Sequence, residues 1–179
     1  MLKIFMIAIV ILLLLIAVMV AIGFSLPKKH IATRVVTLHQ RPEAVFALIS
    51  NFKEAPGWRN NVKQVEVLPS PEGKMLFRET SSDGTLTMEV VESRPPGRLV
   101  TRIADKGLPF GGYWIYEIIP TKEGCQLNIT EHGEIYNPIF RFVSRFFLGY
   151  TRTLDAYLKN VANKFSENIE ITNGQPANL

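Results

Sequence analysis

The sequence predicts an α+β protein. We expect a curved antiparallel sheet of about seven strands, wrapped around a long C-terminal helix and preceded by one membrane-spanning helix. Three observations lead to this class. Residues 4–26 form an uncharged apolar run, seven strand-like runs follow, and the segment after Asn137 has apolar residues at helical spacing. Six of the strands succeed one another with only turn sequences between them, which favours an antiparallel meander.

The N-terminal run "IFMIAIVILLLLIAVMVAIGFSL" is the strongest signal in the chain. As a helix it would be about 34 Å long, whereas the hydrocarbon core of a bilayer is about 30 Å thick. A signal peptide would have a shorter apolar region and then a small-residue cleavage site, for which residues 21–23 offer only a weak candidate. We therefore expect residues 1–26 to be an uncleaved transmembrane anchor.

The charges on either side of this run indicate which side of the membrane the folded domain occupies. Lys3 precedes it, and Lys28, Lys29 and Arg34 follow it, so the positive-inside rule leans toward a cytoplasmic domain. Because the margin is one or two charges, the side of the membrane stays open. We expect a single-pass protein of a bacterial inner membrane. The net charge of +4 suits an anionic membrane surface and is too small to indicate a nucleic-acid partner.

The chain after the anchor divides into a polar linker (27–32), a folded domain (33–168) and a disordered tail (169–179). The first strand is predicted at 33–40. Two short helices follow it, with Pro42 at the first helical position and an end at "EAPGW". The six remaining strands are predicted at 62–68, 74–80, 85–93, 98–104, 112–119 and 125–135.

One long helix is predicted from Pro138 to about residue 168, with Asn137 as its N-cap. Its apolar residues fall within an arc of about 100°; they are Ile139, Val143, Phe146, Phe147, Tyr150, Leu154, Tyr157, Leu158, Val161 and Phe165. This face should pack on the sheet. The opposite side carries Arg141, Arg145, Arg152 and Lys159, either as an ordinary solvated face or as a contact for anionic headgroups.

Two stretches carry a family resemblance. They are "RPEAVFALISNFKEAPGWRNNVKQVEVL", where a strand leads into a helix and a tryptophan bend, and "GGYWIYEIIPTKEGCQLNITEHGEI", which runs into the final helix. In this order they resemble the SRPBCC or START-like superfamily of helix-grip folds, including its polyketide cyclase/dehydrase-type members. The resemblance implies a cavity between sheet and helix that binds a hydrophobic or amphipathic small molecule.

The residues expected to line such a cavity have either a large apolar side chain or a polar group, and they lie on elements predicted to surround the cavity. They are Trp58, Phe77, Arg78, Met88, Tyr113, Tyr116, Glu131, Phe140 and Phe147. Most of the aromatic ones are expected to be core, with part of that core forming cavity wall. Trp58 either plugs the core or stands at the cavity mouth. Glu131 and Arg78 would orient the ligand.

Chemistry in the cavity would need an acid or base. Glu131 shares a strand face with Leu127 and Ile129, and is the best candidate together with Tyr113. The competing interpretation, which base rates favour, places Glu131 in solvent at the strand end or paired with an arginine. Both faces of the predicted strand 112–119 carry large apolar side chains, so the alternation of its residues leaves open which face points inward. The histidines His30, His39 and His132 are expected to be exposed or structural.

The leading functional hypothesis is a membrane-anchored domain that binds a hydrophobic or lipid-like small molecule. One alternative is an enzyme of the cyclase or dehydratase type, and another is a non-catalytic interaction module with a collapsed cavity. The sequence favours a binding protein over an enzyme. It has no metal-ligand spacing and no cofactor motif, and its single cysteine, Cys125, excludes an internal disulfide. Ligand identity and oligomeric state stay open.

Overall fold

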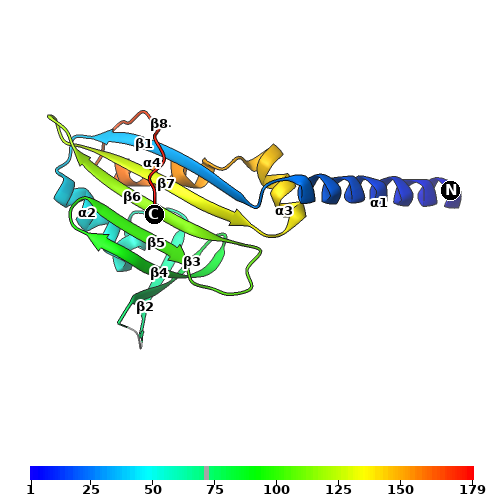
Figure 1. Cartoon of the computed structure of the whole chain (residues 1–179), viewed down its shortest axis with the longest axis horizontal. Coiled ribbons are helices and arrows are strands. Elements are labelled where there is room, and N and C mark those ends of the chain that lie inside the picture. The colour runs from blue at the N-terminus through cyan, green and yellow to red at the C-terminus, as the bar shows by residue number, and fades with distance from the viewer. Residues whose placement is uncertain (71–72) are drawn as a thin grey trace.

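The computed structural model describes residues 1–70 and 73–179. Its elements follow the predicted order (Figure 1). They are α1 Leu2–Ser25, β1 Lys29–Leu38, α2 Pro42–Ser50, η1 Phe52–Gly57, β2 Val62–Leu68, β3 Met75–Ser81, β4 Gly84–Arg94, β5 Arg98–Ile103, β6 Phe110–Pro120, β7 Cys125–Ile135, α3 Pro138–Val143, η2 Ser144–Leu148, α4 Arg152–Lys164 and β8 Thr172–Asn173. The predicted α+β class, with a curved antiparallel sheet and a helix at the C-terminal end, is confirmed.

The sheet has eight strands in the order β2-β3-β4-β5-β6-β7-β1-β8, and every pairing is antiparallel. Strands β2 to β7 form the expected meander, joined by turns. β1 adds to the far side of β7 over ten residue pairs, from Lys29 opposite Glu134 to Leu38 opposite Cys125. It begins four residues earlier than predicted, which shortens the expected linker between α1 and the sheet.

One face of the sheet, here called the inner face, is covered by α2 and α4. In Figure 1, α4 lies behind the sheet and the C-terminal segment crosses in front of it. Tyr116, Leu127 and Ile129 point toward the helices, where they pack with Leu154 and other residues of the main core cluster. Their strand neighbours Ile115 and Asn128 therefore point to the outer face, because side chains alternate along a strand. The inward face of β6, which the sequence left undecided, is the one that carries Trp114 and Tyr116.

The long C-terminal helix is interrupted, which corrects the predicted continuous helix from 138 to 168. α3 ends at Val143, the single π-helical turn η2 follows, and α4 begins only at Arg152. Gly149 lies at the break with φ 73° and ψ 174°, a conformation that essentially only glycine adopts. The apolar arc is continuous in the sequence, but its two halves face different surfaces.

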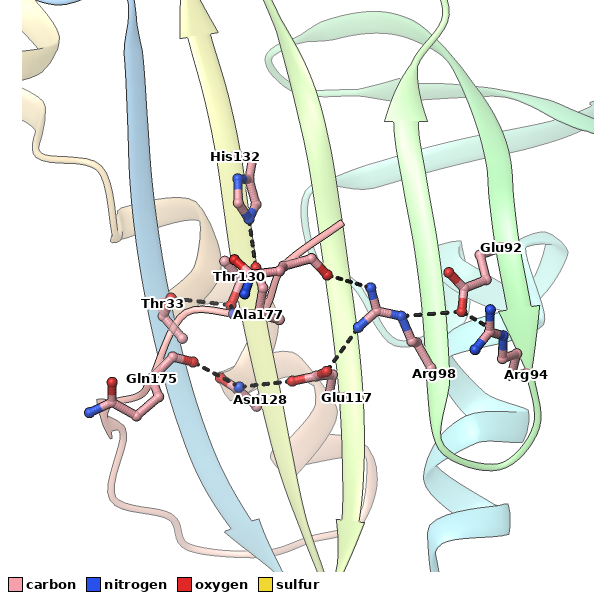
Figure 2. A network of polar contacts seen from close by, with 11 residues as sticks. Thr33, Glu92, Arg94, Arg98, Glu117, Asn128, Thr130, His132, Gln175 and Ala177 are labelled. Carbon is pink, nitrogen blue, oxygen red and sulfur yellow. Dashed lines mark hydrogen bonds and ion pairs between the residues drawn. The ribbon is translucent and has the colours of Figure 1, made fainter.

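The tail is also ordered, contrary to the prediction. Thr172 and Asn173 pair with β1 as β8. Figure 2 shows the residues beyond them crossing the outer face of the sheet, where the Ala177 amide donates to Thr130 Oγ1 at 3.0 Å and His132 Nε2 lies 2.7 Å from the Ala177 carbonyl oxygen. The outer face of β7 presents polar side chains that need hydrogen-bond partners, and the backbone of the tail satisfies them.

The helix α1 extends away from the folded domain, and no residue of its most apolar stretch is buried by the described part of the chain (Figure 1). By length and composition it could cross a membrane. A signal sequence has the same two properties.

Candidate functional site

The centre of the inner face is filled by aromatic side chains. Trp58, at the end of η1, is 8% exposed and meets Tyr157 of α4 edge-on, with ring centres 5.4 Å apart. Tyr157 also contacts Tyr116 at 5.5 Å and Trp114 at 5.7 Å. Trp58 is thus packed inside the core, and the "EAPGW" bend places it there by ending η1 against β2.

A buried ion pair lies beside this cluster. Arg59 Nη2 donates to Glu79 Oε1 at 2.9 Å, and the guanidinium carbon lies 5.2 Å from the centre of the Tyr157 ring. Burial lowers the pKa of Arg59, but the Glu79 carboxylate together with the Tyr157 and Tyr116 phenols raises it by more, so the guanidinium stays charged. Burial raises the pKa of Tyr116 to about 12 and, with the neighbouring Tyr116, raises that of Tyr157 well above its ordinary value. Both phenols are therefore neutral hydrogen-bonding groups at physiological pH.

Two hollows of the described surface lie away from this centre. One, of about 450 Å³, is formed by the β5–β6 loop and its neighbours, including Asp105, Tyr113 and Tyr136. The other, of about 260 Å³, lies beside β1 and is lined by Arg34 and Asp155 among others. Neither contains Trp58, Tyr116 or Tyr157, so neither is the expected cavity between α4 and the middle of the sheet.

A second cluster lies at the end of the inner face nearest α1. His30, in β1, has its Nε2 atom 3.4 Å from Oε1 of Glu131 in β7, and its ring stacks on Tyr150 with centres 4.0 Å apart. We call these three residues the α1-proximal site. The side chains of His30 and Glu131 are 11% and 20% exposed. Glu131 Oε2 is buried and has no hydrogen-bond partner among the residues that the structure describes.

The fold builds this site from three separate segments. In the β1–β7 register, His30 lies opposite Gly133 and Ala32 lies opposite Glu131. A Cβ atom at position 133 would lie 2.2 Å from the His30 ring, so glycine there makes room for the imidazole. Tyr150 comes from the break after η2. An unbroken helix would have carried Tyr150 along the same axis as α4.

The arrangement has a clear chemical capacity. An ionised carboxylate accepts up to about four hydrogen bonds, and Glu131 uses one oxygen toward His30 while its other oxygen is unpaired in a buried position. A bound molecule with a hydroxyl or N–H group could donate to it. The same carboxylate could orient the imidazole for proton transfer. Among the described residues, no group of three or more His, Cys, Asp or Glu side chains is placed to hold a metal ion.

The structure separates the residues predicted to line one cavity. Trp58, Tyr116 and Phe77 lie in the packed interior, where Phe77 stacks on Phe52 at 4.1 Å and Met88 lies opposite Phe77 in the β3–β4 pairing. Glu131 lies on the inner face, at the α1-proximal site.

The other predicted residues lie elsewhere. Arg78 is exposed and pairs with Glu66 at 3.2 Å. Tyr113 points to the outer face, because its neighbour Trp114 points inward. Phe140, in α3, contacts Phe110 at 6.0 Å between ring centres. Phe147 is 74% exposed. Glu131 and Tyr113, the two acid/base candidates, thus lie on opposite faces of the sheet.

His30 is the residue that the sequence interpretation missed. The predicted start of the first strand at residue 33 leaves His30 in the linker. Extending that strand by four residues places His30 on the same face as Val36 and Leu38, since side chains alternate with a period of two. The alternation was therefore a usable signal, but only once the start of the strand was known.

Comparisons with known proteins agree with this architecture. A family model described as polyketide cyclase / dehydrase and lipid transport matches residues 29–166. No curated protein matches the chain. The match begins at the first residue of β1, so α1 lies outside it.

Several solved structures share the fold. A START superfamily protein from Mycobacterium smegmatis aligns with a TM-score of 0.61 and 15% identity, over 76% of this chain and 97% of that one. The Zhui aromatase/cyclase from Streptomyces sp. R1128 aligns with a TM-score of 0.62 and 12% identity, over 77% of this chain and 94% of that one. Truncated norcoclaurine synthase from Thalictrum flavum aligns with a TM-score of 0.61 and 11% identity, over 78% of this chain and 95% of that one. At these identities the likeness establishes the fold alone.

Proposed function

The chain belongs to the polyketide cyclase/dehydrase and lipid transport family, and from this premise we propose that it is a membrane-anchored protein that binds an amphipathic small molecule at the α1-proximal site. The observation that carries the proposal is the unpaired, buried Oε2 of Glu131 beside His30 and Tyr150. Buried polar atoms are nearly always hydrogen-bonded, so an exception beside the half-buried Tyr150 is a candidate ligand contact. Trp58 Nε1 and Arg59 Nε are also unpaired, but they lie in the packed centre of the inner face.

The chemistry of the site defines the ligand class. Glu131 calls for a hydrogen-bond donor, such as a hydroxyl or N–H group. The surrounding inner face is aromatic, with Trp114 directly opposite Glu131 in the β6–β7 pairing. Burial of an apolar ligand body against such a surface contributes about 25 cal/mol per Å². A molecule with a polar head and a hydrophobic body therefore fits both requirements.

The filled centre limits how such a ligand can bind. Because Trp58, Tyr116 and Tyr157 occupy the middle of the inner face, the ligand must enter beside Tyr150. Tyr150 is only half-buried and follows Gly149 directly, so a change in its position would uncover His30 without disturbing α4. The membrane anchor is supported by the length and apolar composition of α1 and by the absence of any buried residue in its most apolar stretch.

A cyclase-type enzyme is the second candidate, and the same pair supports it. A histidine within reach of a carboxylate is a common acid/base arrangement. Tyr113 is not available for this role, since it lies on the outer face. Once a bound species is identified, it can be supplied in excess to the wild-type protein and to H30A. Accumulation of a product with the wild-type protein alone would favour the enzyme, and recovery of unchanged ligand would favour the binding protein.

The primary test is recovery of the ligand. Full-length protein extracted from its host membrane in copolymer nanodiscs can be compared as wild type, E131Q and E134Q by mass spectrometry of bound small molecules. Glu134 is the matched control, because it lies three residues along β7 and is bonded on the outer side to Tyr136 and Lys29. We expect one amphipathic species in the wild type and E134Q, and at least about tenfold less in E131Q, from loss of a charge-assisted hydrogen bond.

A different outcome would contradict the proposed binding site. If all three proteins carry the same mixture of bulk phospholipid, the α1-proximal site does not select a ligand. The interaction module with a collapsed cavity, the third hypothesis from the sequence, would then be favoured by the filled centre of the inner face.

A further inference from the structure

The segment between β7 and α4 exposes an unusual amount of apolar surface. Residues 138–148, which comprise α3 and η2 and are called here the interfacial segment, expose four large apolar side chains: Ile139, Phe146, Phe147 and Leu148. Phe147 is 74% exposed and Phe146 is 57% exposed. Phe142 contacts both of these phenylalanines, with ring centres 4.9 Å and 6.1 Å away, so the aromatic groups form one patch. Contiguous apolar patches on a soluble domain commonly mark a contact surface.

The interfacial segment is fixed to the end of α1. A Cβ atom at Gly23 would lie 2.0 Å from the carbonyl oxygen of Pro138, so only glycine allows this approach of the two helices. Arg141 is 3% exposed and donates from Nη1 to the Leu26 carbonyl at 2.8 Å, and from Nη2 to the Tyr136 carbonyl at 3.2 Å. The cation thus satisfies a carbonyl at the C-terminal end of α1, where the helix dipole favours positive charge. Figure 1 shows α3 beside the domain end of α1.

This attachment sets the depth of the segment relative to α1. The 24 residues of α1 would measure about 36 Å, which exceeds a hydrocarbon core of about 30 Å by roughly one turn. The final turn, which contains Gly23, therefore reaches the boundary between acyl chains and headgroups. Amphipathic segments at that boundary bury their apolar side about 5–10 Å deep.

We propose that the interfacial segment lies in the surface of the bilayer that α1 crosses, with Phe146 and Phe147 among the acyl chains and Arg145 among the headgroups. The inference rests on the membrane anchor of the proposed function. The bilayer is the occupant that the structure favours, because the patch lies beside the domain end of α1, where Gly23 approaches Pro138 and the apolar Phe24 is exposed. Exposed basic groups lie in the same zone: Arg145 within the segment, and Lys28 and Lys29 just after α1.

This position has a consequence for the α1-proximal site. Tyr150, which stacks on His30, follows the interfacial segment after a single residue. The entrance beside Tyr150 therefore opens at the membrane surface. An amphipathic ligand would exchange between the site and the lipid layer without crossing bulk water.

The test measures the depth of single residues in the intact protein. F147C, I11C and K122C can each be labelled with an environment-sensitive fluorophore and reconstituted in nanodiscs of phosphatidylcholine and phosphatidylglycerol. Ile11 lies in the middle of α1, and Lys122 is exposed in the β6–β7 turn. The native Cys125 is fully buried and its pKa is raised by burial to about 11, so it stays largely unlabelled at neutral pH. Quenching is read with nitroxide lipids and with aqueous iodide.

We expect lipid nitroxides near the headgroups to quench the probe at 147 at least about twofold more than the probe at 122, with iodide showing the reverse order. Equal quenching at 147 and 122 would overturn the inference. Protection of 147 from iodide without quenching by lipid would also overturn it, since a protein surface would then cover the patch. The probe at 11 separates the two proposals: if deep nitroxides fail to quench it, the anchor itself is wrong.

Discussion

The two ends of the inner face differ in how they use similar side chains. In the centre, Trp58 and Tyr157 pack edge to face and are both buried between sheet and helix. At the end nearest α1, the aromatic Tyr150 covers a histidine–carboxylate pair, and a carboxylate oxygen is left unpaired. The difference comes from the helix break at Gly149. Opposite α4 the face is covered by buried aromatic rings beside the Arg59–Glu79 pair, and beside the break the half-buried Tyr150 covers His30 and Glu131.

The largest expected effect concerns the sealed centre. W58A should lower the free energy of unfolding by about 3–5 kcal/mol, because it leaves a large cavity beside Tyr157. F147A, at an exposed position, should change it by about 0.5 kcal/mol or less. Urea unfolding of the full-length protein in detergent, followed by circular dichroism, gives both values. If W58A were tolerated as well as F147A and instead weakened ligand retention, Trp58 would line a cavity mouth.

The ion pair beside the centre should give the next largest effect. E79Q leaves the Arg59 charge without its partner and should cost about 3 kcal/mol, the lower end for breaking a buried pair, since both side chains keep some exposure. E66Q removes an exposed carboxylate from Arg78 and should cost less than about 1 kcal/mol. The same unfolding measurement compares the two. Equal costs would mean that the centre is far more hydrated than its packing indicates.

A smaller effect is expected at the boundary between the two regions. G149A forces a side chain into a backbone conformation that costs about 1–3 kcal/mol, although the added Cβ atom would meet no neighbour within 4 Å. G57A is the matched control, since Gly57 has equal space without a positive φ, and it should be neutral or stabilising by up to about 1 kcal/mol. Thermal unfolding of both variants checks this. A neutral G149A would show that the break can be rebuilt as helix.

The smallest effect is a pH dependence at the far end of α4. Burial raises the pKa of Glu167, but hydrogen bonds from the His39 amide and from Gln40, at 2.9 Å and 2.8 Å, lower it by more. A lowered pKa in the folded state contributes stability that is present above the ordinary value of 4.5 and is lost as the pH falls through the folded value. E167Q should therefore weaken the protein at neutral pH and reduce its sensitivity to acid.

The control for this titration is E170Q, which changes an exposed carboxylate nearby. Unfolding free energies measured from neutral pH down to pH 3 compare the three proteins. A wild-type curve with the same acid slope as that of E167Q would contradict the assignment. Because α1 and the α1-proximal site lie at the other end of the sheet, ligand retention should be unchanged in E167Q.

Sequence patterns were sufficient wherever burial follows a local period. The meander, the two short helices, the family resemblance and the strand face that Glu131 shares with Leu127 and Ile129 were predicted, and the fold class and family are confirmed. Each depends on alternation, helical spacing or turn residues, which are set by neighbouring residues alone. The lining of a cavity was not predicted as well, because Arg78 and Tyr113 lie on the outer face while Trp58 fills the centre.

Three features were decided only by the tertiary structure. The apolar arc from Ile139 to Phe165 predicted one helix, but contact of Pro138 with Gly23 commits its first part to α1. His30 became part of a site because Gly133 makes room for its ring on the neighbouring strand. The polar tail became ordered because the outer face of β7 offers Thr130 and His132 as partners. In each case the deciding contact joins residues far apart in the chain, and a local pattern carries no information about such a partner.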